Sequence, residues 1–145
     1  MFDDYAHHPT EVRATLDAAR TLGARRVIAC FQPHLFSRTR MLAREFGEAL
    51  ALADVVAVVD IYPAREATED FPGVTGLTVA RAAADAAGGR RVLWTPSVEE
   101  AAARLAAEAG KHDVVLTLGA GDVDRVAELL TRRPRAGGDC ELGPS

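Results

Sequence analysis

The stretch RVIACF, residues 26–31, is a short apolar run that contains β-branched and aromatic side chains. Such a run is too short for a core helix, and its composition predicts a strand. Three runs of the same kind follow it: DVVAVVD (54–60), RVLW (91–94) and DVVLTL (113–118). Because these strands are apolar throughout and do not alternate, we expect both faces of the sheet to be covered.

Amphipathic segments separate these strands. Apolar residues recur at helical spacing in five stretches rich in Ala, Leu, Glu and Arg: 9–22, 39–52, 78–87, 97–109 and 122–132. Strands that alternate with helices pack as right-handed crossovers in a mainly parallel sheet. The sequence therefore predicts a three-layer, Rossmann-like α/β fold with about six strands, one of them at the N-terminus.

The composition limits the classes of partner. The chain has 145 residues, 48% hydrophobic and 26% charged, which is typical of one globular domain. A net charge of −4 provides no basic field for nucleic acid or for an anionic membrane. We find no membrane-spanning run and no signal peptide, so we expect a cytoplasmic protein. The composition of segment 133–145 predicts a disordered tail behind a domain at 1–132.

Several kinds of chemistry find little support in the motifs. Cys30 and Cys140 fit neither a metal spacing nor a disulfide framework, and we expect two free thiols. The two neighbouring histidines, His7 and His8, lack a third metal ligand at a usual spacing. The glycine-rich LGAGDVDRV (118–126) lacks the dinucleotide-binding spacing, so we expect a structural turn there, and no P-loop occurs in the chain.

Polar side chains gather after the predicted strands. In an open α/β sheet, ligands bind beyond the carboxyl ends of the strands. The polar and glycine residues at those positions are, strand by strand, Asp4, Tyr5, His7 and His8; Gln32, His34, Ser37, Arg38 and Arg40; Asp60, Tyr62, Arg65 and Glu66; Thr95; and Gly119, Gly121 and Asp122. The first two clusters are the densest, and the connection 61–76 is long enough to be a functional loop.

The second cluster favours an anion site. Arg38 and Arg40 lie at the start of a predicted helix, whose N-terminal N–H groups already attract an anion. Two guanidinium groups there suit a carboxylate or a phosphate. A solvated basic helix start paired with Glu45 is the structural alternative. Likewise, Asp3 or Asp4 could cap the first helix, and a histidine after a strand is often only a hydrogen-bonded structural residue.

Five motifs stand out in order along the chain: DDYAHHPTEV (3–12), CFQPHLFSRTR (30–40), DIYPARE (60–66), GVTG (73–76) and LGAGDVDRV (118–126). In this order and spacing they resemble the C-terminal domain of the alanine-adding branch of the Mur ligase family. The resemblance covers residues 2 to about 132, and its specific part is the first two motifs. It implies one domain of a longer enzyme, with Met1 as an added start residue.

The resemblance also implies a reaction. The family joins an amino acid to a UDP-sugar acid in peptidoglycan synthesis, here L-alanine to UDP-N-acetylmuramate. ATP phosphorylates the carboxylate of the sugar acid, and the alanine amine then attacks the acyl phosphate. A first domain would hold the UDP-sugar, and a central P-loop domain would hold most of the ATP and the Mg²⁺. We therefore expect this chain alone to be inactive.

The family pattern assigns roles to the residues after the first strand. Asp4 matches the carboxylate that binds the ATP ribose. Tyr5 and His7 match positions that face the amino acid and the reacting carboxylate, and His7 is the candidate catalytic residue because it could steady developing negative charge.

The family pattern also assigns roles after the second strand. Arg38 matches an arginine that grips the alanine carboxylate, with support from Arg40 and His34. Leu35 stands where the family often has a second arginine, so the pattern predicts a single-arginine grip. No metal ligand is assigned.

Two alternatives remain open. The chain could instead match the C-terminal domain of the murein tripeptide-recycling ligase, although the S-R-T-R and Q-P-H motifs favour the alanine-adding branch. A phosphoacceptor receiver domain is the second alternative, because the Asp3/Asp4 pair, Asp60 and Thr95 resemble its acidic Mg²⁺ pocket. A receiver should carry a lysine at the end of the last strand, where this chain has Leu118 and Gly119.

Overall fold

A computed structural model describes residues 2–132; Met1 and the tail predicted at 133–145 lie outside the described residues. The elements are β1 (Phe2–Asp4), α1 (Pro9–Arg20), β2 (Arg26–Phe31), α2 (Phe36–Leu50), β3 (Val55–Val58), the 3₁₀ turn η1 (Thr68–Asp70), α3 (Gly76–Ala87), β4 (Arg91–Trp94), α4 (Val98–Glu108), β5 (Asp113–Leu118) and α5 (Asp124–Arg132). Most helix ends lie within two residues of the predicted ones, but α2 begins at Phe36 and not at 39.

The strands form one parallel sheet in the order β1-β5-β2-β3-β4. The predicted α/β fold is confirmed, but the prediction of about six strands is wrong, because residues 2–132 supply five. The long connection between β3 and α3 contains two prolines, one glycine and η1, and it adds no strand to the sheet. Strand β5, the last in sequence, lies between β1 and β2.

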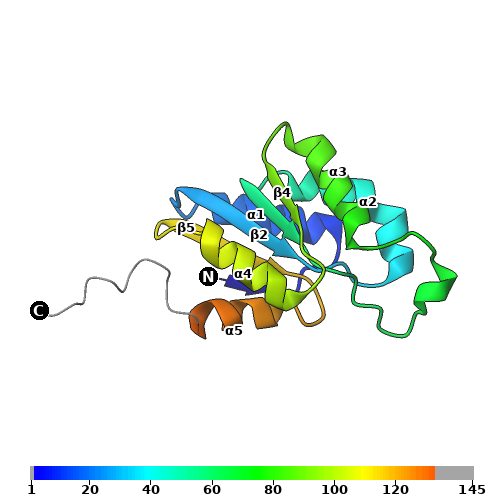
Figure 1. Cartoon of the computed structure of the whole chain (residues 1–145). Helices are drawn as coiled ribbons and strands as arrows, with labels where there is room; N and C mark the ends of the chain where they lie inside the picture. The colour runs from blue at the N-terminus through cyan, green and yellow to red at the C-terminus, as the bar shows by residue number, and fades with distance from the viewer. Residues whose placement is uncertain (1, 133–145) are drawn as a thin grey trace, which may run out of the picture.

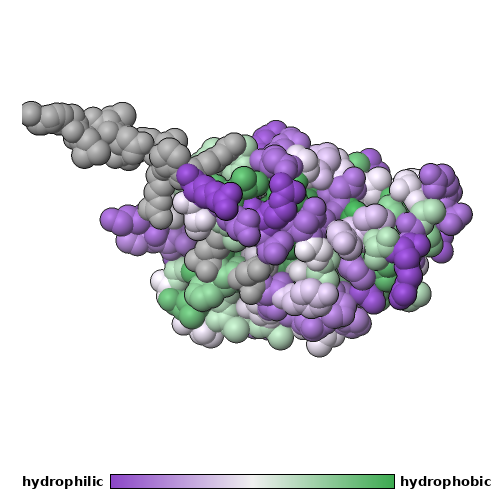
Figure 2. All heavy atoms as spheres, turned by 90° about the horizontal axis from the view of Figure 1, so that it is seen from below, coloured by the Kyte–Doolittle hydropathy of each residue, from purple (hydrophilic) through white to green (hydrophobic). Residues whose placement is uncertain are grey.

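Helices cover both faces of the sheet (Figure 1). On one face α1, α2 and α3 bury Leu16, Phe46 and Val79 against the strands. On the other face α4 and α5 bury Leu105 and Val126. The surface on the α5 side is mostly hydrophilic outside the grey atoms, with apolar groups in smaller patches (Figure 2). No helix within residues 2–132 has the length and apolar character needed to cross a membrane.

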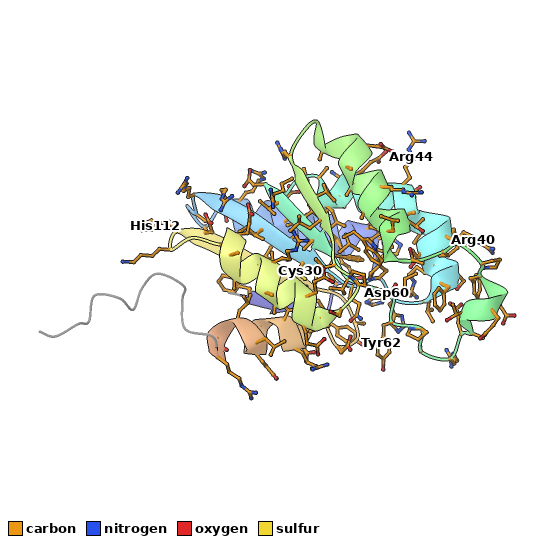
Figure 3. The ribbon with its side chains drawn as sticks, viewed as in Figure 1. Cys30, Arg40, Arg44, Asp60, Tyr62 and His112 are labelled. Atoms are coloured by element: carbon orange, nitrogen blue, oxygen red, sulfur yellow. The ribbon has the colours of Figure 1, made fainter. Side chains whose placement is uncertain are left out.

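Cys30 lies inside the sheet and is a free, fully buried thiol, as predicted (Figure 3). Burial raises the pKa of its thiol to about 12, so it carries no thiolate at neutral pH. Cys140 falls outside the described residues.

A charged cluster closes the amino ends of the strands. The Arg26 Nη2 atom lies 2.8 Å from Asp113 Oδ2, and the Asp113 side chain is only 1% exposed. The backbone N–H of Gly110 donates to the same carboxylate at 2.7 Å. The hydrogen bond from Arg26 lowers the pKa of Asp113, although burial acts in the opposite direction.

We expect acidification to weaken the fold through Asp113. Its pKa is lower in the folded state than in the unfolded state, so its contribution is fully present above about pH 4 and is lost as the pH falls through the folded-state value. Urea denaturation between pH 7 and pH 3 should therefore show a shallower loss of stability in Asp113→Asn than in the wild-type chain. Asp85→Asn, at an exposed position on α3, should keep the wild-type slope. Equal slopes for all three proteins would contradict the prediction.

Candidate functional site

The loops at the carboxyl ends of the strands diverge around β5. The loops after β1 and β2 lead to helices on one face of the sheet, whereas the loop after β5 leads to α5 on the other face. Such a reversal opens the crevice in which open α/β sheets bind ligands. Figure 3 shows Asp60 and Tyr62 at this end of the sheet and His112 at the opposite end.

Gln32 links the loop after β2 to the loop after β5 by two hydrogen bonds. Its Nε2 atom donates to Asp122 Oδ1 at 2.6 Å, and the backbone N–H of Asp122 donates to Gln32 Oε1 at 2.8 Å. Gly119 and Gly121 have φ values of 133° and 151°, which favour glycine, and both lie against Gln32. The glycine-rich stretch is thus a structural turn, as the sequence predicts.

His34 lies at the centre of the site. Its ring stacks on Tyr62, with 5.9 Å between the ring centroids and 12° between the planes. Its Nδ1 atom is buried and has no hydrogen-bond partner among the described residues. Burial lowers the pKa of His34, and the neighbouring Arg38 guanidinium and His7 imidazole act in the same direction. The imidazole is therefore neutral at pH 7 and can offer Nδ1 to a ligand.

Three loops converge on this imidazole. The charges that act on His34 come from His7 after β1, Arg38 after β2, and Arg65 and Glu66 after β3. The structure therefore brings together three of the predicted site residues. It adds Arg65 and Glu66, which follow the third predicted strand but which the motif resemblance does not assign to the site. The length of the connection 61–76 was the available signal.

Arg38 is the third residue of α2 and is half-buried. Its Nη1 atom is buried without a partner, and no ion pair between described residues includes this guanidinium. Leaving a buried polar group unpaired costs about 1–3 kcal/mol, more for a charged one, so native structures rarely do so without a reason. An anionic ligand would supply the missing partner.

Leu35 adjoins both unpartnered groups in a strained backbone conformation, with φ 70° and ψ 135°. Such a conformation costs a non-glycine residue about 1–3 kcal/mol, and it persists only where the surroundings impose it. The Leu35 N–H donates to the carbonyl of Tyr62 at 3.0 Å, which holds the strained residue against the loop after β3.

The N-terminus of α2 already carries a carboxylate from the chain itself. The backbone N–H of Ser37 donates to Glu66 Oε1 at 3.0 Å, and the Ser37 hydroxyl donates to Glu66 Oε2. Burial acts to raise the pKa of Glu66, but the hydrogen bonds from Ser37 outweigh it and the pKa lies below its ordinary value. An internal carboxylate thus satisfies the Ser37 N–H at this helix end, and Arg38 remains available for a ligand.

The residues after β1 divide into structural and available ones. His8 is the N-cap of α1, and its Nδ1 atom accepts from the Thr10 N–H at 3.3 Å. The His7 Nδ1 atom lies 3.2 Å from the carbonyl oxygen of Tyr5 and 3.8 Å from Glu11 Oε1. Tyr5 is 71% exposed and meets His7 edge to face. Tyr5 and His7 thus extend the site toward solvent.

Asp4 and Arg40 already have partners. The Asp4 carboxylate accepts a hydrogen bond from the Thr15 hydroxyl of α1, which fixes its direction. The Arg40 guanidinium carbon lies 5.2 Å from the centroid of the Phe71 ring, beside the loop after β3. Arg40 is exposed, and it links α2 to that loop.

A cleft of about 380 Å³ has Tyr62 among its lining residues. Its charged side chains are Asp60, Glu99, Asp122 and Arg125, and the last pairs with Glu99 at 2.8 Å. Asp60 Oδ1 accepts from the N–H groups of Ile61 and Gly76. Within residues 2–132 no three His, Cys, Asp or Glu side chains are placed to hold a metal ion.

Comparisons with known proteins give the relatives of this chain. A family model described as "Mur ligase, glutamate ligase domain" matches residues 1–121. The UDP-N-acetylmuramate–L-alanine ligase of Cutibacterium acnes is 58% identical over 132 residues, and the match covers 90% of this chain and 27% of that protein. The Mycolicibacterium smegmatis protein of the same name is 52% identical, with 90% and 27% covered. The chain thus spans about a quarter of the length of these relatives.

Solved structures share the fold. The UDP-N-acetylmuramate–alanine ligase of Thermotoga maritima aligns with a TM-score of 0.66 at 23% identity, over 88% of this chain and 24% of that one. The MurF ligase of the same organism, solved with ADP, aligns with a TM-score of 0.58 at 21% identity, over 88% and 26%.

Proposed function

The chain belongs to the Mur ligase family, and on this premise we propose that it is the amino-acid-binding domain of an ATP-dependent ligase that joins L-alanine to UDP-N-acetylmuramate. The observation that carries the proposal is the pair of buried, unpartnered atoms His34 Nδ1 and Arg38 Nη1. The carboxylate of an amino acid accepts hydrogen bonds from a guanidinium and, in one tautomer, from an imidazole.

The names of the relatives support the choice of substrate. The proteins from Cutibacterium acnes and Mycolicibacterium smegmatis are named as alanine-adding ligases, and the chain matches them at 58% and 52% identity. In the proposed reaction the γ-phosphoryl group of ATP passes to the carboxylate of the sugar acid. The alanine amine attacks the acyl carbon, and phosphate leaves as the amide forms.

The residues of this chain have separate tasks in that reaction. Arg38 and His34 hold the alanine carboxylate, which fixes where the amine lies. His7, in the adjoining loop, steadies negative charge as the acyl phosphate reacts, and Tyr5 flanks the amino acid. Arg40 supports the start of α2 through its contact with Phe71. Mg²⁺ and the ATP phosphates would be held mainly by the central domain of the family.

Asp4 is the candidate contact to the ATP ribose, because a carboxylate accepts from both ribose hydroxyls. We expect Asp4→Asn, assayed within a complete ligase, to raise the KM for ATP roughly tenfold, since one charge-assisted hydrogen bond is worth about 1.5–3 kcal/mol. Asparagine can still accept from Thr15, so the fold should persist. Asp17→Asn, at an exposed position on α1, is the control. An unchanged KM for ATP would remove Asp4 from the ribose site.

A chimera tests the proposed function directly. In the chimera, this chain replaces the matching 27% of the Cutibacterium acnes relative. The remaining part of the chimera comes from that relative. We expect the chimera to release ADP only when UDP-N-acetylmuramate and L-alanine are both present, and mass spectrometry should detect the amide product. The unmodified relative is the positive control. A folded chimera that makes no amide from alanine would refute the proposal.

The same chimera also tests the alternative that the chain comes from the recycling ligase. Offering the murein tripeptide in place of L-alanine distinguishes the recycling ligase from the alanine-adding one. Product from the tripeptide, with none from alanine, would transfer the chain to the recycling branch.

A further inference from the structure

Backbone hydrogen bonds join the loop after β3 to the loop after β2. The Tyr62 N–H donates to the Pro33 carbonyl at 2.9 Å, and the Leu35 N–H donates to the Tyr62 carbonyl at 3.0 Å. His34 and Tyr62 form a parallel bridge and stack their rings. The position of His34 thus depends on a segment about thirty residues further along the chain.

Helix α2 has no side-chain cap of its own. Its N-cap residue is Leu35, which has no polar side chain, and its first turn contains no acidic residue. Helices normally satisfy their first N–H groups with a nearby Ser, Thr, Asp or Asn. Here the carboxylate of Glu66 does so, by accepting from both the N–H and the hydroxyl of Ser37. A negative charge at this helix end is also favoured by the helix dipole.

This cap leaves the neighbouring guanidinium uncommitted. Glu66 is close enough to His34 to act on its pKa, yet it forms no ion pair with Arg38 among the described residues. Both of its carboxylate oxygens are used at Ser37, which is the residue before Arg38. The carboxylate therefore fixes the first turn of α2 without neutralising the arginine that the turn presents.

We propose that Glu66 is a positioning residue: by capping α2 through Ser37, it holds Arg38 and His34 in the geometry that receives the carboxylate of the amino-acid substrate. The inference deepens the proposed function and rests on it for the identity of that substrate. Glu66 itself does not contact the substrate. Its removal should therefore weaken amino-acid binding and leave the chemical step almost unchanged.

Hydrogen exchange tests the contact without any assay of activity. In the 145-residue chain, Glu66→Ala should speed exchange of the Ser37 amide roughly tenfold, because a hydrogen bond to a charged acceptor is lost. Glu66→Gln should keep exchange within about twofold, since its side-chain oxygen still accepts from the amide and its NH₂ group can donate to the hydroxyl. Glu69→Ala, an exposed carboxylate in the same loop, should change nothing at Ser37.

Kinetics in the chimera test the consequence. Glu66→Ala should raise the KM for L-alanine about five- to twentyfold with kcat within about twofold, which is the signature of lost binding. Glu66→Gln should restore the KM, and Glu69→Ala should leave it unchanged. Adding Ser37→Ala to Glu66→Ala should have little further effect, because Glu66→Ala already removes the partner of the Ser37 hydroxyl.

The possible outcomes are distinct. An unchanged KM in Glu66→Ala would overturn the inference, whether or not the Ser37 amide exchanges faster. So would an impaired Glu66→Gln, because charge and not the cap would then be what matters. If the unmodified chimera makes no product from alanine, the proposed function fails, and so does the assignment of alanine as the substrate. Exchange at the Ser37 amide would still show whether Glu66 caps α2.

Discussion

Replacing Arg38 with alanine in the chimera is expected to raise the KM for L-alanine roughly 100-fold, because two charge-assisted hydrogen bonds to a carboxylate are worth about 3 kcal/mol or more together. The guanidinium is half-buried and its Nη1 atom lacks a partner within residues 2–132, so little in the fold depends on it. Because the unpaired polar group costs about 1–3 kcal/mol in the folded chain, we expect the free energy of unfolding of Arg38→Ala not to fall below the wild-type value.

Two further variants test which property of Arg38 matters and whether the effect is specific to its position. Arg38→Lys keeps the charge but loses the planar pair of donors, so its KM should lie between those of the wild type and Arg38→Ala. Arg44→Ala removes an arginine from the same helix, 87% exposed and paired with Glu48 at 3.1 Å, and should leave the KM unchanged. A wild-type KM in Arg38→Ala would show that the alanine carboxylate binds elsewhere.

Gly121→Ala is expected to lower the free energy of unfolding by about 2–4 kcal/mol and to impair the site at the same time. The residue has φ 151°, and a Cβ atom there would lie 2.6 Å from Gln32 Oε1 and 2.9 Å from the Tyr62 ring. Relieving these contacts must displace Gln32 or Tyr62, and Tyr62 is the ring on which His34 stacks. Urea denaturation measures the first effect, and the KM for alanine in the chimera measures the second.

Gly88→Ala is the matched control for this substitution. Gly88 also has a positive φ, 60°, but no atom lies within 4 Å of the position of an added Cβ. Gly88→Ala should lower the free energy of unfolding by about 1 kcal/mol, from backbone strain alone, and should leave the KM for alanine unchanged. If both variants lose the same stability, crowding against Gln32 and Tyr62 is not what constrains Gly121.

The alternation of strands and helices could be predicted because each signal is local. RVIACF and DVVLTL carry enough apolar, β-branched residues to predict strands, and the helical segments carry their periodicity within a few turns. The start of α2 could not be predicted, because its cap comes from Glu66, 29 residues away. The sixth strand had no residues assigned to it, and the chain between β3 and α3 forms loop and a short turn.

Part of the site could be predicted from the rule that ligands bind beyond the carboxyl ends of the strands in an open α/β sheet. That rule, with the motif resemblance, selected His7, His34 and Arg38, and the structure brings these three together. The direction of a side chain is not a property of local sequence. Hence neither the contact between Arg40 and Phe71 nor the use of His8 as the cap of α1 could be deduced beforehand.

The position of β5 in the sheet governs when this site can form. β1, which leads to His7, pairs among the described residues only with β5, whose residues come more than a hundred positions later. On a ribosome, the loops that carry His34, Arg38 and Glu66 could associate through β2 and β3 while β1 still lacked a neighbour. Contacts of such long sequence separation form slowly. The residues of β1 are therefore made well before their partner strand, and a nascent chain cut before β5 would lack the strand pairing that places the loop with His7.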